Sequence, residues 1–125
     1  MTVTDVQNAC YRDMRGTGFT VIHYDDMPDS LPDERLVIRT GSFRDAAHWT
    51  DGSVELILAC PDVRGQVTAR LGDMESEFKD FMDSLDVMEW GGEYYHYELL
   101  NRAIEQDRQM KCHYAHYTYN FKLLY

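Results

Sequence analysis

The sequence predicts one α+β domain over residues 1–125, in which two helices pack on an antiparallel or mixed β-sheet that ends in a long C-terminal hairpin. A chain of 125 residues is the usual size of a single domain. Two segments repeat apolar residues every three or four positions, which is typical of amphipathic helices. The last segment alternates apolar and polar residues, which is typical of a half-buried strand. The expected order of elements is α-β-β-β-α-β-β.

The first helix is expected over residues 4–15. Thr4 and Gln7 have the spacing of a capping box at its start, and Gly16 and Gly18 end it. Its apolar stripe consists of Val3, Val6, Cys10 and Met14. Because these residues recur at three and four positions, we expect them to face the sheet together.

Three strands are expected between the two helices, over residues 19–24, 35–40 and 53–60. Asp25–Pro32 is expected to be a loop because it is rich in Asp and Pro. Gly41–Asp51 has no clear periodicity, and it is expected to be a connection that ends in a tight turn at Asp51-Gly52. Ser53–Cys60 is apolar on both faces, which predicts a central strand buried on both sides.

The second helix is expected over residues 67–85 and has the clearest periodicity in the chain. Its apolar face consists of Val67, Leu71, Met74, Phe78, Met82 and Leu85. A single helix cannot bury its own apolar face, so this face is expected to pack on the sheet.

The C-terminal third is expected to be a β-hairpin. Val87–Trp90 predicts a short strand and Gly91-Gly92 a turn. The long strands are expected over residues 94–104 and 110–125, joined by Glu105–Gln109. In the last strand, one face carries Ala115, Tyr117, Tyr119, Phe121 and Leu123, and the other carries Tyr114, His116, Thr118, Asn120 and Lys122.

Charge and composition exclude several classes of protein. The chain has 22 acidic and 12 basic residues, a formal net charge of −10, which argues against a protein that grips nucleic-acid phosphates. Its apolar runs are too short to cross a bilayer, so no membrane partner is expected, and no secretory signal opens the chain. Cys10, Cys60 and Cys112 are far apart, which predicts reduced thiols in a cytoplasm, some of them buried.

Residue types that could do chemistry form no recognisable catalytic motif. Cys112, His113 and His116 are the closest set of metal-ligand types, but on a strand His113 points away from the other two, which lie about 13 Å apart. A zinc site would need help from elsewhere, for example from His96. Acidic pairs such as Asp25-Asp26 fit a solvated surface better than acid–base catalysis. We therefore expect no catalytic residues, no metal, no cofactor and no enzymatic activity.

The sequence points instead to interaction surfaces. Tyrosines crowd the expected hairpin, where they can pair across strands in the core or form an interface. Trp49 lies in a polar connection, where an exposed aromatic residue indicates an interface and a buried one covers the core. The candidate interface residues are Asp25, Asp26, His48, Trp49, Tyr94, Tyr114 and His116.

The segment Glu34–Phe81 resembles the small tail-terminator and neck proteins of tailed bacteriophages, which join or complete the tail at the head. The resemblance is carried by ERLVIRTGSF, then SVELILACPD with Gly65 as a strand that exits into a turn, and by Arg70-Leu71 with Met74-Glu75 in the following helix. The closing HYTYNFKLLY is similar to the last strand of that family. Cys60 and the aromatic ending depart from the family pattern, which bears on the subfamily more than on the fold.

The resemblance implies a non-enzymatic structural protein of a phage or prophage virion, made in the host cytoplasm. Its partners would be further copies of itself in a ring, commonly of six subunits, and the tail-tube and head-connector proteins. DNA would pass through the ring without being bound specifically, and an acidic bore would repel its phosphates. Two other readings remain: a small acidic inhibitor that mimics DNA and binds a basic host protein, and an enzyme with a concave pocket of titrating groups.

Overall fold

The computed structural model describes residues 1–43, 51–62 and 69–124. At residues 42, 43 and 51 it describes the backbone but not the side chain. Within these residues, two α-helices, two 3-10 helices and six strands follow the order α1, η1, β1, η2, β2, β3, α2, β4, β5, β6. Their bounds are α1 Val3–Met14, η1 Arg15–Thr17, β1 Val21–His23, η2 Tyr24–Asp26, β2 Arg35–Phe43, β3 Asp51–Pro61, α2 Ala69–Ser84, β4 Met88–Trp90, β5 Glu93–Asp107 and β6 Cys112–Leu124.

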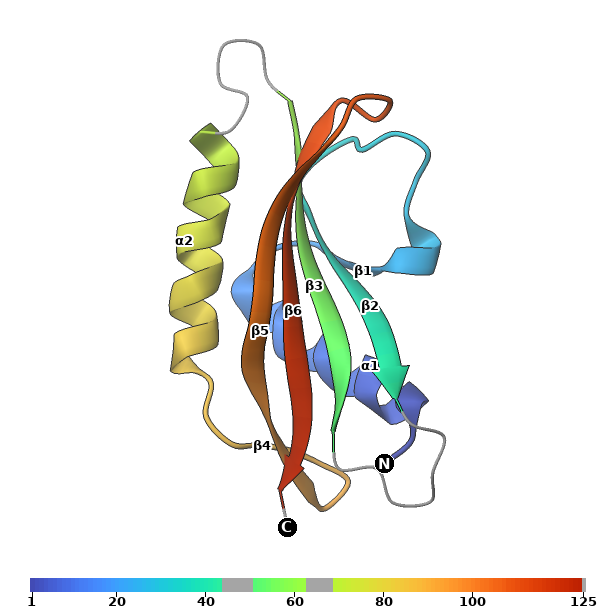
Figure 1. The fold of residues 1–125 in the computed structure, drawn as a ribbon, viewed down its shortest axis with the longest axis vertical. Helices are drawn as coiled ribbons and strands as arrows, with labels where there is room; N and C mark the ends of the chain where they lie inside the picture. The colour runs from blue at the N-terminus through green and yellow to red at the C-terminus, as the bar shows by residue number, and fades with distance from the viewer. Residues whose placement is uncertain (44–50, 63–68, 125) are drawn as a thin grey trace.

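The strands form one mixed sheet in the order β1-β2-β3-β6-β5-β4. β1 pairs with β2 in parallel, and every other neighbouring pair is antiparallel. Long strands run side by side through the centre of the sheet, with α1 behind them and α2 alongside β5 (Figure 1). The single α+β fold predicted from the sequence is thus confirmed, with β4 as the short additional strand.

The main core lies between the two helices and one face of the sheet. Val6, Cys10 and Met14 of α1 and Met74 and Phe78 of α2 are all fully buried in it. The β6 residues predicted to share a face, Ala115, Tyr117, Tyr119, Phe121 and Leu123, complete it. The period-two pattern therefore identified the buried face of β6 correctly, because both helices cover that face alone.

The opposite face of the sheet, here called the open face, carries a smaller second core at one end. Val37, Ile57, Ala59 and Cys112 are buried there, covered by Leu31 from the connection between β1 and β2. β3 is therefore buried on both faces along much of its length, as its apolar sequence predicted.

The start of α1 differs from the prediction. The capping box is formed by Thr2 and Asp5, not by Thr4 and Gln7: Thr2 Oγ1 accepts from the Asp5 amide and Asp5 Oδ2 accepts from the Thr2 amide. Gln7 instead donates from Nε2 to Thr40 Oγ1 of β2 at 3.2 Å. Val3 is exposed, because it lies in the first turn and points away from the sheet.

The prediction of a tight turn at Asp51-Gly52 is wrong, as is the prediction that Gly41 begins a connection. Gly41 continues β2, where an added Cβ would lie 2.0 Å from Ser53 Oγ, so the close approach of the two strands requires glycine. Gly52 pairs with Phe43 on one side and with Phe121 on the other. Pairing on both sides overrides the local preference of Asp-Gly for a turn.

In the C-terminal hairpin, β5 is longer than predicted and β6 begins two residues later than predicted, at Cys112. Gly91 and Gly92 form the expected turn, with φ values of 58° and 84° that favour glycine. Glu105–Asp107 belong to β5 rather than to the connection, because Glu105 pairs with Tyr114 and Asp107 with Cys112. The turn is left to residues 108–111.

A buried carboxylate joins α1 to the hairpin. Tyr95 and Tyr97 of β5 donate their hydroxyls to Asp13 Oδ2 at 2.5 and 2.8 Å. Arg12 donates to Asp13 Oδ1 at 3.1 Å and to the Glu89 carbonyl at 2.8 Å, and its guanidinium lies over the Trp90 ring. Asp13 is thus paired and hydrogen-bonded, which is the condition for burying a charge.

Replacing Asp13→Ala is expected to lower the free energy of unfolding by about 3–5 kcal/mol, because two tyrosine hydroxyls and Arg12 would lose their common partner. Asp83→Ala is the matched control: Asp83 also pairs with a cation on a helix, Lys79, but both side chains are exposed. We expect it to cost below about 1 kcal/mol. Urea unfolding followed by circular dichroism measures both, and equal costs would contradict the role given to Asp13.

The core tyrosines predict a loss of stability in alkali. Burial raises the pKa of Tyr117 and of Tyr119 to about 12, and burial also raises the pKa of Tyr95 and Tyr97. Above about pH 10, the unfolded chain loses these protons and the folded chain keeps them, so the free energy of unfolding falls between about pH 10 and 12. Urea unfolding at a series of pH values measures the fall, and Tyr119→Phe should make it shallower. A wild-type stability that stays level across this range would contradict the prediction.

Candidate interaction site at the sheet edge

The outer edge of β5 is open along most of its length. β4 pairs only with Glu93–Tyr95, and no described strand pairs with the outer side of His96–Asp107, a stretch here called the β5 edge. Its outward backbone groups are free to pair with another strand, and long uncovered edges of this kind are sites of strand addition.

Large apolar side chains stand exposed on this edge. Leu99, Leu100 and Ile104 are 53%, 58% and 47% exposed. The register between β5 and β6 shifts between Leu99 and Asn101, so Leu100 is the extra residue of a β-bulge. The bulge leaves two consecutive leucines in contact with water, and apolar surface gathered in this way indicates an interaction site.

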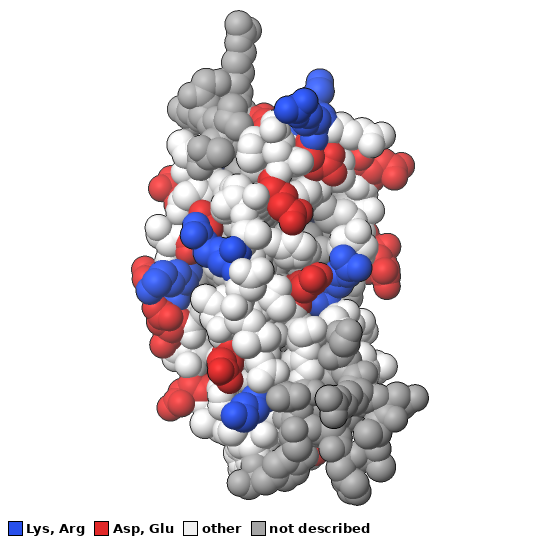
Figure 2. Space-filling model, viewed as in Figure 1, with Lys and Arg blue, Asp and Glu red and all other residues white. Residues whose placement is uncertain are grey.

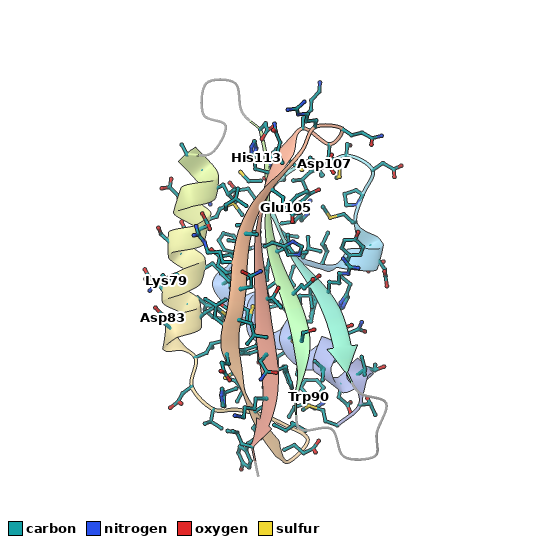
Figure 3. The ribbon with its side chains drawn as sticks, in the orientation of Figure 1. Lys79, Asp83, Trp90, Glu105, Asp107 and His113 are labelled. Carbon is teal, nitrogen blue, oxygen red and sulfur yellow. The ribbon has the colours of Figure 1, made fainter. Side chains whose placement is uncertain are left out.

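A groove of about 500 Å³ runs between the β5 edge and α2. Its apolar lining comes from Met82, Tyr97, Leu99, Tyr117 and Tyr119. Its polar rim is already paired: Glu75 Oε1 accepts from Arg102 at 2.7 Å and from the Tyr117 hydroxyl at 2.8 Å, and Lys79 donates to Asp83 at 2.7 Å. Lys79 and Asp83 lie together on α2 (Figure 3). An extended segment added to β5 could therefore place alternate side chains in this groove without separating buried charges.

The open face carries a row of charged side chains across four strands. Arg39 Nε lies 3.6 Å from Glu55 Oε2, and His116 lies between Glu55 at 3.6 Å and Glu105 at 3.7 Å. The Arg39 guanidinium also lies 4.7 Å from the centre of the Tyr24 ring. This row borders a groove of about 360 Å³ floored by Val37 and Ile57. The row links β2, β3, β6 and β5: Arg39 and Glu105 at its ends are exposed, whereas Glu55 Oε2 and His116 Nε2 at its centre are buried and form no hydrogen bond with the described residues.

Acidic residues outnumber basic residues most clearly in two elements, α2 and β5. Acidic and basic groups are interspersed over the face of the molecule seen in Figure 2. β5 and α2 are equally acidic: the fifteen residues of β5 include four acids and one base, and the sixteen residues of α2 include five acids and two bases, so each has a balance of −3. The acids of α2 are Asp73, Glu75, Glu77, Asp80 and Asp83, most of them exposed.

The predicted interface residues do not form one site. Tyr114 and His116 border the same groove on the open face. Asp25 and Asp26 are exposed on η2, directly after Tyr24, which also lines that groove. Tyr94 pairs with Leu124, which lies ten residues along β6 from Tyr114, a separation of about 33 Å. His48 and Trp49 lie outside the described residues.

The candidate zinc ligands do not converge. Cys112 is buried in the second core, His113 Nδ1 contacts Asp62 Oδ1 at 2.5 Å, and His116 faces the two glutamates. In residues 1–43, 51–62 and 69–124, no three His, Cys, Asp or Glu side chains are placed to hold a metal ion. Burial raises the pKa of Cys10 to about 12, which disfavours its reactive thiolate.

The sequence did not single out the exposed apolar residues of the β5 edge. Leu99, Leu100 and Ile104 interrupt the alternation of apolar and polar residues in β5. The sequence signal for these exposed residues was the adjacent apolar pair followed by another apolar residue in the same strand. Whether such a strand lies at the edge depends on the sheet order, which no local pattern specifies.

Comparison with known proteins supports the fold alone. The sequence matches no family model and no curated protein. Seven chains of solved structures are similar to it. One of them, whose name states no function, has a TM-score of 0.56 and 14% sequence identity, and the match covers 100% of this chain and 97% of that one. None of the described helices has the length and apolar character needed to cross a membrane. The chain therefore shares its whole architecture with a solved protein of very different sequence.

Proposed function

We propose that this chain is a non-enzymatic structural protein of a tailed phage or prophage, which joins or caps the tail at the head–tail interface as an oligomeric ring. The observation that carries the proposal is the β5 edge, with Leu99, Leu100 and Ile104 exposed along it. A ring needs a surface on each subunit that another subunit can cover, and exposed backbone groups beside apolar side chains supply one.

The segment that resembles the tail-terminator and neck proteins gives a second support. Glu34–Phe81 includes all of β2 and β3 and most of α2, which are the central elements of the core. The resemblance therefore concerns the framework that fixes where the β5 edge stands relative to α2. In this proposal the partners are other copies of the chain, tail-tube proteins and head-connector proteins, and the protein works in the virion.

The charge of the chain fits the passage of DNA through such a ring. With a net charge of −10, subunits repel one another and also repel DNA phosphates. The acidic α2 is the element that would make a bore acidic if it faced inward. Magnesium should favour assembly, because it screens repulsion between the subunits.

Leu100→Lys is expected to weaken self-association by about tenfold or more, because a lysine in the contact would be desolvated without a partner. Val87→Lys is the control, since Val87 is 51% exposed but lies in the connection between α2 and β4. Light scattering after size exclusion, with and without magnesium and with purified tail tubes as a template, measures the mass. We expect a species of about six subunits for the wild type and for Val87→Lys.

A wild-type chain that stays monomeric in all these conditions, tail tubes included, would overturn the proposal. The second candidate would then gain: a small acidic inhibitor that mimics DNA. Asp73, Glu77 and Asp80 favour it, because they recur at four and three residues and are exposed along one side of α2. That candidate predicts a one-to-one complex with a basic nucleic-acid-binding protein, which salt should dissociate.

A further inference from the structure

The two outer edges of the sheet are open at the same level. β1 is the outermost strand on one side, and no described strand pairs with its outer side. The printed pairings connect Ile22 with Val37, Val37 with Ile57, Ile57 with His116, and His116 with Ala103. β1 therefore lies level with the middle of the β5 edge on the other side of the same sheet.

The two edges also have the direction that antiparallel pairing needs. β1 runs parallel to β2, and three antiparallel steps then lead from β2 through β3 and β6 to β5. β1 and β5 consequently run in opposite directions. If a second copy is placed beside the first in the same orientation, β1 of one copy meets the β5 edge of the other as an antiparallel neighbour.

The β1 side and the β5 edge carry opposite charges at one level of the sheet. Arg35 and Arg39 of β2 lie on the open face near the β1 side, and Arg39 is half exposed. The β5 edge carries Glu98, Glu105 and Asp107. Arg35 pairs with Ala59, Ala59 with Tyr114 and Tyr114 with Glu105, so Arg35 and Glu105 lie at one level of the sheet. Neighbouring copies would thus bring Arg35 to the level of Glu105, whereas the exposed Asp25 and Asp26 follow the other end of β1, so the complementary charges are confined to the Arg35 end of the contact.

We propose that the β5 edge binds β1 of a second copy of this chain, head to tail, so that the sheet continues from subunit to subunit. This inference rests on the proposed function and names the contact by which the ring closes. Contact at equal level needs no shift along the strands, and a head-to-tail contact of this kind builds a ring where the rotation between neighbouring copies closes. Leu99 pairs with Tyr119, Tyr119 with Val54 and Val54 with Thr40, so Leu99 would meet the second copy at the level of Thr40, beyond the residues of β2 that pair with β1.

Pairing of β5 with β5 of a second copy fits less well. A two-fold contact would bring the acidic residues of one edge against the same acidic residues of the other. It would also close after two subunits and leave β1 without a partner, so it could not build a ring by itself.

Paired cysteines test the contact directly. Ile22→Cys and Ala103→Cys place thiols at the matched level on β1 and β5, and the native Cys10, Cys60 and Cys112 are too buried to react. The variants are assembled at the protein concentration and magnesium level that give the ring, then oxidised and analysed on non-reducing gels. We expect cross-linked dimers when the two single variants are mixed, at least about tenfold more than for either variant alone. The double variant should give a ladder that ends at the ring.

Each other outcome overturns the inference in its own way. Cross-linking of Ala103→Cys with itself would show a two-fold β5 contact. A ring by light scattering with no cross-link in the mixture would place the contact elsewhere and leave the proposed function standing. A mixture of Ile22→Cys with Val87→Cys is the control for random collision, and equal yields in the two mixtures would also overturn the inference. If Ile22→Cys prevents folding, His23→Cys with Arg102→Cys repeats the test at the next matched level.

Discussion

The buried Asp13 carboxylate joins α1 to β5 and, through Arg12, to β4 at one edge of the sheet. It binds the hydroxyls of Tyr95 and Tyr97 from β5 and the guanidinium of its neighbour Arg12, which holds the backbone of β4 at Glu89. Removing the Asp13 carboxylate would leave the tyrosine hydroxyls buried without a hydrogen-bond acceptor, so the positions of α1 and β5 must allow all of these hydrogen bonds at once. The short β4 is thereby fixed against the first residues of β5, and the remainder of that strand is left uncovered.

Both helices pack on one face of the sheet, and this asymmetry explains the rest of the surface. The face under α1 and α2 is apolar from β2 to β5, and the ring of Phe78 of α2 packs at a tilt on that of Tyr117, with the ring centres 4.9 Å apart. The open face is covered only at one end, by Leu31 and its neighbours, and elsewhere carries the polar row of Arg39, Glu55 and His116. The molecule therefore offers a polar face and two strand edges, while its one continuous apolar face is already covered.

Local patterns predicted the elements well and the ends of elements less well. The helical stripe of α2 and the alternation of β6 depend on burial of one face, which repeats along the chain and is visible in it. Gly52 and Gly41 were misjudged because their conformation depends on strands that pair from elsewhere in the chain. The β5 edge was not predictable for the same reason: Leu99 and Leu100 are exposed because β4 ends before it reaches them and because the bulge at Leu100 breaks the register with β6.

Backbone pairing and surface charge would act differently in an assembly of this chain. Hydrogen bonds between strand edges are short-range and depend little on salt, whereas repulsion among acidic subunits is long-range and is screened within about 10 Å at 0.1 M salt. The strand edges would then set which surfaces meet, and ionic conditions would set when they meet. Because α2 has a net charge of −3, the side of a ring that α2 faces would carry a negative potential. An inward-facing α2 layer would therefore repel DNA from the wall of the bore, while the mixed charges of the open face would remain available outside for protein partners.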